Sequence, residues 1–79
     1  MEYILTFGST HRVLKVEELL KGHGVSFKLL PAPKELSRYC DLVISVDGLV
    51  LAEVRDILSS EGVEPKGVYR KEDDRYVEV

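Results

Sequence analysis

Two copies of one short pattern, separated by a proline-rich segment, most constrain how this chain can fold. Each copy reads as strand, helix, strand, and Gly-Val follows the helix at 24–25 and again at 62–63. The segment between them, 31–40, holds two of the three prolines and no apolar period, so it cannot supply the helix that a parallel sheet would need there. With right-handed crossovers, the pattern predicts an α+β fold, the ferredoxin-like βαββαβ sandwich. In that fold an antiparallel sheet carries two helices on one face.

The apolar pattern also places the individual elements. Strands are expected, from their β-branched and aromatic residues, at 2–7, 25–30, 41–46 and 66–70, with a short edge strand at 76–79. Helices are expected, from apolar residues on one side of a helical wheel, at 11–21 and from Asp47 to about Ser60. We expect the first strand to be buried on both faces and the charged run 70–75 to be a solvated turn.

Composition limits the classes of function. The chain of 79 residues makes a single domain, 1–79, and so short a chain buries only about 60% of its unfolded surface. A formal net charge of -3 argues against nucleic-acid binding, and no run approaches the roughly 18 apolar residues of a membrane span. Met1 leads directly into a strand, so we expect no signal peptide, and a single cysteine indicates a reducing cytoplasm. A homodimer through sheet edges is compatible with so small a core.

The segment 31–40 carries the reactive chemistry, because it ends in the only cysteine, Cys40. Free cysteine is often a small buried hydrophobe, and that interpretation stays open. Three features favour a reactive thiol instead: Cys40 lies where the loop joins a strand, it follows polar residues, and Lys34 and Arg38 share its loop. Nearby cations favour the thiolate, which is the nucleophilic form.

Few reactions suit one thiolate in so small a chain. A dithiol oxidoreductase needs a second cysteine, and zinc needs about three or four ligands, whereas only His11 and His23 accompany Cys40. We therefore expect no metal and no cofactor. A covalent carrier remains, in which the thiolate accepts a sulfur or selenium atom and passes it on. Two other classes stay open: a non-catalytic module that binds a partner or metabolite through the sheet, and a small enzyme with His11 as base.

Four motifs in order resemble a family of small selenium/sulfur carrier-like proteins. They are Phe-Gly-Ser-Thr-His at 7–11, Leu-Leu-x-x-x-Gly-Val at 19–25, Leu-x-Pro-x-Pro-Lys at 29–34 and Ser-x-x-Cys at 37–40. The resemblance covers nearly the whole chain and implies a small α/β domain whose cysteine carries sulfur or selenium as a persulfide or selenopersulfide. It implies donor and acceptor proteins as partners. The matching positions are Ser9, Thr10, His11, Pro31, Pro33, Lys34 and Cys40.

Two positions depart from that family's pattern. Lys34 stands where arginine is usual, which replaces a planar fork by a point charge. Asp41 stands where glycine commonly follows the cysteine, and a carboxylate there disfavours a neighbouring thiolate by like-charge repulsion.

Each expected binding residue also has a structural interpretation. Ser9 or Thr10 is a suitable N-cap, and the helix start that it caps also attracts anions. His11 is either a proton donor or acceptor near the cysteine or a solvated side chain, while Pro31 and Pro33 stiffen the loop. In the predicted fold the end of the first strand lies beside the start of the third, so Cys40 is expected to face residues 9–11.

Overall fold

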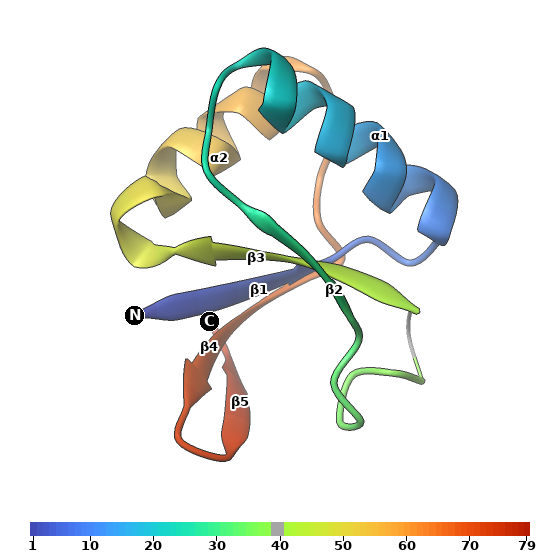
Figure 1. Cartoon of the computed structure of the whole chain (residues 1–79), viewed down its shortest axis with the longest axis vertical. Helices are drawn as coiled ribbons and strands as arrows, with labels where there is room; N and C mark the ends of the chain where they lie inside the picture. The colour runs from blue at the N-terminus through green and yellow to red at the C-terminus, as the bar shows by residue number, and fades with distance from the viewer. Residues whose placement is uncertain (39–40) are drawn as a thin grey trace.

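The computed structural model describes residues 1–38 and 41–79, in seven elements (Figure 1). They are β1 (Glu2–Thr6), α1 (Thr10–Gly22), β2 (Lys28–Pro31), β3 (Leu42–Asp47), α2 (Gly48–Ser60), β4 (Gly67–Glu72) and β5 (Arg75–Glu78). Within these residues no helix is long and apolar enough to cross a membrane.

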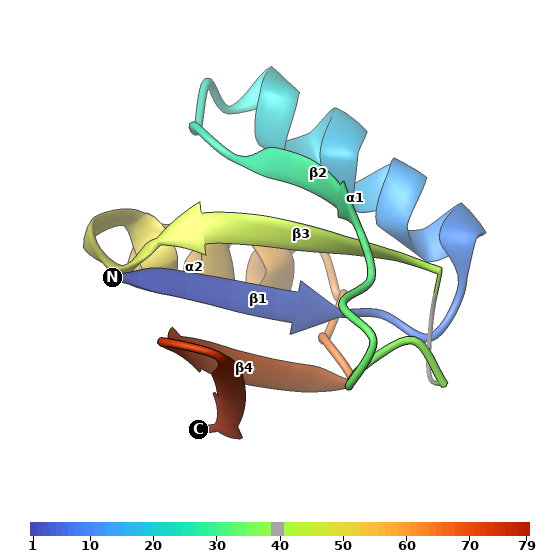
Figure 2. The same cartoon turned by 60° about the horizontal axis from the view of Figure 1, so that its bottom comes forward.

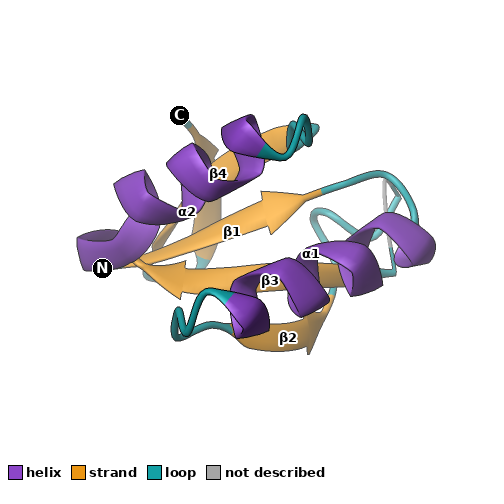
Figure 3. Cartoon of the chain, turned by 90° about the horizontal axis from the view of Figure 1, so that it is seen from above, coloured by secondary structure: helices purple, strands orange, loops and turns teal. Residues whose placement is uncertain are grey.

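The strands form one sheet in the order β2-β3-β1-β4-β5, and all neighbouring strands are antiparallel. Both helices lie on the same face of this sheet (Figures 1 and 3). The α+β class, the antiparallel sheet and the one-sided helices are therefore confirmed. The predicted ferredoxin-like βαββαβ topology is wrong as stated, because β5 pairs with β4 and makes the order βαββαββ. The edge strand expected at 76–79 is this fifth strand.

Two strands have a boundary that differs from the prediction by more than one residue. The second strand begins at Lys28 and includes Pro31, which pairs in register with Leu42. Proline is tolerated there because β2 is an edge strand, where a missing N–H interrupts no ladder. The solvated turn expected at 70–75 is present but shorter: β4 continues to Glu72, and only the exposed Asp73 and Asp74 separate it from β5. Asp73 has a φ of 41°, a left-handed conformation that aspartate adopts more readily than most residues.

Each helix begins at a side-chain cap that the sequence had suggested. The hydroxyl of Ser9 accepts a hydrogen bond from the Arg12 N–H at 3.2 Å, and a carboxylate oxygen of Asp47 accepts one from the Leu49 N–H at 2.9 Å. The residues that the helices bury against the sheet are Val13, Val16 and Leu20 of α1 and Val54, Ile57 and Leu58 of α2. This layer is the main hydrophobic core, and it orients the start of α1 relative to the end of β1.

The opposite face of the sheet has its own small core. Ile4 and Val43 are almost fully buried there, together with Leu36 from the loop between β2 and β3, which is only 4% exposed. In Figure 1 this loop lies beneath the sheet, on the side away from the helices. Because Ile4 and Leu5 point to opposite faces and both are buried, the prediction that the first strand is buried on both faces is confirmed.

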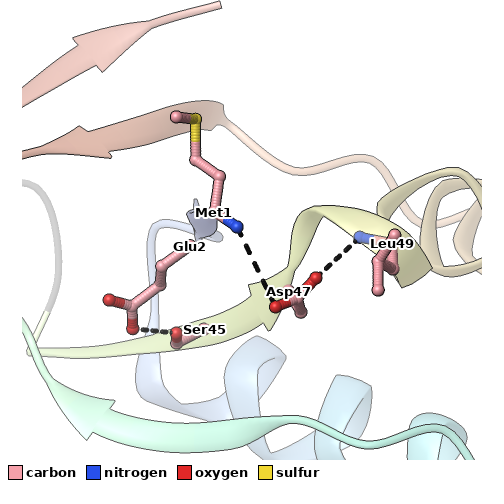
Figure 4. A network of polar contacts seen from close by, with 5 residues as sticks. All are labelled: Met1, Glu2, Ser45, Asp47 and Leu49. Carbon is pink, nitrogen blue, oxygen red and sulfur yellow. Dashed lines mark hydrogen bonds and ion pairs between the residues drawn. The ribbon is translucent and has the colours of Figure 1, made fainter.

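A polar network fixes the start of β1 against the end of β3 (Figure 4). The Ser45 hydroxyl donates to a carboxylate oxygen of Glu2, and the N-terminal amine lies 3.9 Å from Asp47. Glu2 also lies 3.5 Å from the ammonium of Lys71 on β4. The hydrogen bond from Ser45, with the positive charge of Lys71, lowers the pKa of Glu2 below its usual value, although partial burial opposes this. The network supports the β1–β3 register at the end of the sheet remote from the loop.

The buried loop residue generates a stability prediction. Leu36→Ala should lower the free energy of unfolding by about 2–4 kcal/mol, because it leaves a cavity between the loop and the sheet. Urea unfolding measures this. Leu49, which is 94% exposed on α2, supplies the control, and Leu49→Ala should change stability by less than about 0.5 kcal/mol. Equal effects of the two changes would contradict the packing of the loop.

The Glu2 network generates a pH prediction. Because the fold lowers the pKa of Glu2, its ionised form stabilises the native state above the usual pKa of 4.5, and this contribution disappears as the pH falls through the lowered native value. Glu2→Gln should therefore be less stable than the parent chain at neutral pH, and the difference should shrink in acid. Urea unfolding across this pH range measures it, with the exposed helix residue Glu53, changed to Gln, as control. If the stability difference between Glu2→Gln and the parent chain stays constant as the pH is lowered, the stabilising role of the network is refuted.

Candidate functional site

Four strand ends meet at one end of the sheet, where the loop 32–41 is attached. The register pairs Thr6 with Gly67 and Pro31 with Leu42. Figure 2 shows the ends of β1 and β2, the starts of β3 and β4 and the start of α1 together on the right of the view. The expectation that the end of the first strand lies beside the start of the third is confirmed by the pairing of Leu5 with Ile44.

The described part of the loop is held by short-range hydrogen bonds. At its base the Ala32 N–H donates to the Asp41 carbonyl at 2.9 Å, which joins the two sides of the loop. The Leu36 N–H donates to the Pro33 carbonyl at 2.9 Å, and the Ser37 hydroxyl donates to the Lys34 carbonyl at 3.0 Å. These bonds form a compact turn over 34–38, and Leu36 anchors it beneath the sheet.

A cleft of about 410 Å³ lies beside this turn, and we call it the loop cleft. Its lining residues are Thr6, Gly8, Arg38, Lys66 and Tyr69. Thr6 and Tyr69 belong to the sheet and lie on the same face as Ile4, which is the face that the loop covers. Arg38 comes from the loop itself. Two residues with cationic side chains and two with hydroxyl groups thus line one small volume.

Two glycines allow the walls of the loop cleft to come close together. The Lys66 N–H donates to the Thr6 carbonyl at 2.7 Å, and the aliphatic part of Lys66 then crosses Gly8, where a Cβ would lie 3.0 Å from Lys66 Cε. The ring of Tyr69 covers Gly67 in the same way, since a Cβ there would lie 2.8 Å from Tyr69 Cε1. Side chains at either glycine would push Lys66 or Tyr69 out of place.

The predicted binding residues divide between different places. Arg38 lines the loop cleft, but His11 lines another cavity of about 240 Å³ together with residues 12, 15 and 62–64. Ser9 is the N-cap of α1, and Thr10 is the exposed first residue of that helix. Among the described residues, the loop cleft and the His11 cavity therefore share no lining residue.

The remaining predicted residues belong to the loop. Pro31 ends β2, Pro33 accepts the hydrogen bond that starts the turn, and Lys34 is exposed to solvent. None of the three lines the loop cleft. Cys40, the predicted carrier residue, lies outside the described residues.

Sequence reasoning missed Thr6, Lys66 and Tyr69. Thr6 and Tyr69 were assigned to strands and Lys66 to the start of one, with no local pattern to mark them as site residues. Only the pairing of β1 with β4 brings these positions next to the loop. A signal for them would have required knowledge of the strand order.

Other cavities have a different character. One of about 380 Å³ lies at the far end of the sheet, and its lining includes Glu2 and Asp47, whose carboxylates take part in the network of Figure 4. In the described part of the chain, no group of three or more His, Cys, Asp or Glu side chains is arranged to hold a metal ion. The loop cleft differs from the far-end cavity in being lined by two cationic residues, one of which, Arg38, comes from the loop.

Comparison with known proteins identifies the family of this chain. A family model described as "Putative Se/S carrier protein-like" matches residues 2–70, from the first strand through most of β4, and so includes the loop and most of the sheet. No curated protein and no solved structure matched the chain. Because the match spans far more than half of its length, the chain belongs to the putative Se/S carrier protein-like family.

Proposed function

We propose that this protein carries sulfur or selenium as a persulfide or selenopersulfide on Cys40. The observation that carries the proposal is membership of the Se/S carrier protein-like family, whose matched region, 2–70, contains the only cysteine of the chain. The flanking residues support it in two ways, through the positive charge of the loop and through the anchored turn at 34–38.

The chemistry requires one thiolate and no external oxidant. The Cys40 thiolate attacks the terminal sulfur of a persulfide on a donor protein. A new S–S bond forms at Cys40, the donor's S–S bond breaks, and the donor cysteine leaves as a thiolate. In the second step a thiolate of the acceptor attacks the terminal sulfur on Cys40, and Cys40 leaves as a thiolate. Selenium is transferred in the same way, and the transferred atom keeps its oxidation state in both steps. Donor and acceptor proteins are accordingly the partners of this function.

Positive charge near the cysteine would favour the ionised thiolate and the ionised persulfide of Cys40. Arg38 precedes Cys40 by two residues and lines the loop cleft together with Lys66. Nearby cations stabilise a thiolate and therefore increase its nucleophilic population. Asp41 acts in the opposite direction, so the balance depends on the cations of the loop.

The anchored turn at 34–38 would help a docked donor to reach the sulfur that follows it in the chain. Leu36 is buried beneath the sheet, and the bond from Ala32 to Asp41 closes the base of the loop. A segment that is already ordered loses less conformational entropy when a partner binds. The family's cysteine thus follows a turn that is anchored before any partner arrives.

Adduct formation on Cys40 tests the proposal directly. Incubation with a cysteine persulfide donor should add one sulfur atom to the peptide that contains Cys40, as measured by mass spectrometry without reduction. Cys40→Ser should show no adduct. A parent chain that stays unmodified, under conditions where a small control thiol takes up sulfur, would refute the carrier function and leave a binding module that uses the sheet.

The contribution of charge has its own test. Arg38→Ala should slow alkylation of Cys40 at neutral pH by a factor on the order of 3–10, because the thiolate loses a nearby cation. Stopped-flow measurement with a neutral alkylating reagent gives the rate. Lys15→Ala removes a positive charge on α1, outside the loop cleft, and should leave the rate unchanged. Equal rates in all three proteins would exclude this role for Arg38.

A further inference from the structure

We propose that the loop cleft binds a small tetrahedral oxyanion without forming a covalent bond. The ligand class is a sulfate-, selenate- or phosphate-like group, either as the free ion or at the end of a small molecule. This inference does not depend on the carrier function, because it requires no sulfur on Cys40 and no transfer step.

The charge of the loop cleft is opposite to that of the whole chain. The chain has a formal net charge of -3, but the described lining of the loop cleft contains one guanidinium, one ammonium and no carboxylate. A guanidinium binds two oxygens of a tetrahedral anion in a fork, while an ammonium acts as a point charge. Arg38 and Lys66 therefore bring both kinds of cationic group to the lining of one cleft.

Hydroxyl groups extend the set of hydrogen-bond donors. Thr6 Oγ1 donates to the Gly67 carbonyl over 3.4 Å, which is long for a bond between two oxygens, so an anionic acceptor would compete well for its hydrogen. The hydroxyl of Tyr69 lies over Gly67, 2.9 Å from the position that a Cβ there would take. Both hydroxyls are on the wall formed by the sheet, across from the loop that bears Arg38.

The position of Lys66 is determined by the backbone. Its N–H is bonded to the Thr6 carbonyl at 2.7 Å, and its aliphatic part lies across Gly8, which has a φ of +83°. A long side chain whose stem is already placed loses less freedom when its ammonium binds a ligand. The volume of about 410 Å³ is within the usual range for small-molecule sites, so a substituent on the anion also fits.

The other large cavities lack this character. The cavity of about 380 Å³ at the far end of the sheet includes the carboxylates of Glu2 and Asp47. A cavity of about 520 Å³ between α2 and β5 shares Lys66 and includes Arg55, but it adds the carboxylates of Asp56, Glu64 and Glu78. The His11 cavity has the cations of Arg12 and Lys15 but also the carboxylate of Glu64. Negative charge in those linings opposes an anion, so the loop cleft is the favoured position.

Titration with sodium sulfate tests the inference, followed by amide chemical shifts in ¹⁵N-labelled full-length protein. Sodium chloride at the same ionic strength is the reference, because it removes general screening effects. Saturable shifts are expected at Thr6, Gly8, Lys66 and Gly67. Shifts that do not saturate, or that chloride reproduces, would overturn the inference.

Matched variants locate the site. Lys66→Met keeps the aliphatic part across Gly8 but removes the charge, and should weaken sulfate binding on the order of tenfold. Lys34→Ala removes a cation from the same loop, outside the lining, and should bind like the parent chain. An equal loss in both variants would show general attraction to positive charge and would overturn the inference.

Two further experiments test where the anion comes from and whether Cys40 takes part in binding it. The first experiment compares inorganic phosphate with glycerol phosphate. Tighter binding of glycerol phosphate would indicate an anion at the end of a small molecule. Equal or weaker binding would indicate the free ion, and both ligands belong to the proposed class. Cys40→Ser should bind sulfate as the parent does, whatever its persulfide chemistry. Loss of sulfate binding in Cys40→Ser would place the anion at the cysteine instead and overturn the assignment to the loop cleft.

Discussion

The burial of Leu36 beneath the sheet is the interaction on which the arrangement of the candidate site depends. A long connection between β2 and β3 would otherwise extend into solvent from the edge of the sheet. Instead, Leu36 packs with Ile4 and Val43 on the face opposite the helices. That one contact turns the loop under the sheet and places Arg38 beside Thr6 and Tyr69. A small second core therefore determines where the charged residues of the loop lie.

The order of the strands supplies the rest of the site. Since β1 lies between β3 and β4, the chain that enters β4 passes next to the chain that leaves β1. Lys66 is held there by its bond to the Thr6 carbonyl, and Gly8 leaves room for its stem. A cation from the second half of the chain thus joins a cation from the central loop. The polar network around Glu2 has its main role at the other end of the sheet, where it stabilises the same strand pairing.

Most of the fold could be predicted from local patterns. Apolar periodicity located both helices to within a residue or two, and Ser9 and Asp47 were recognisable caps. The proline-rich loop correctly excluded a helix between the second and third strands. The β4–β5 hairpin was harder to predict, because its charged residues suggested a solvated turn. Their pairing in β4 and β5 is decided by partners across the hairpin, not by their own propensities.

By itself, the sequence determined the two strand-helix-strand units, the single cysteine after a proline-rich loop and the family resemblance that the family model supports. Only the tertiary structure decided that Arg38, Lys66 and Tyr69 line one cleft, and that His11 lies in a separate cavity. The reason is physical. Periodicity and capping are properties of neighbours in the chain, whereas a cleft forms between segments that strand pairing and buried contacts bring together.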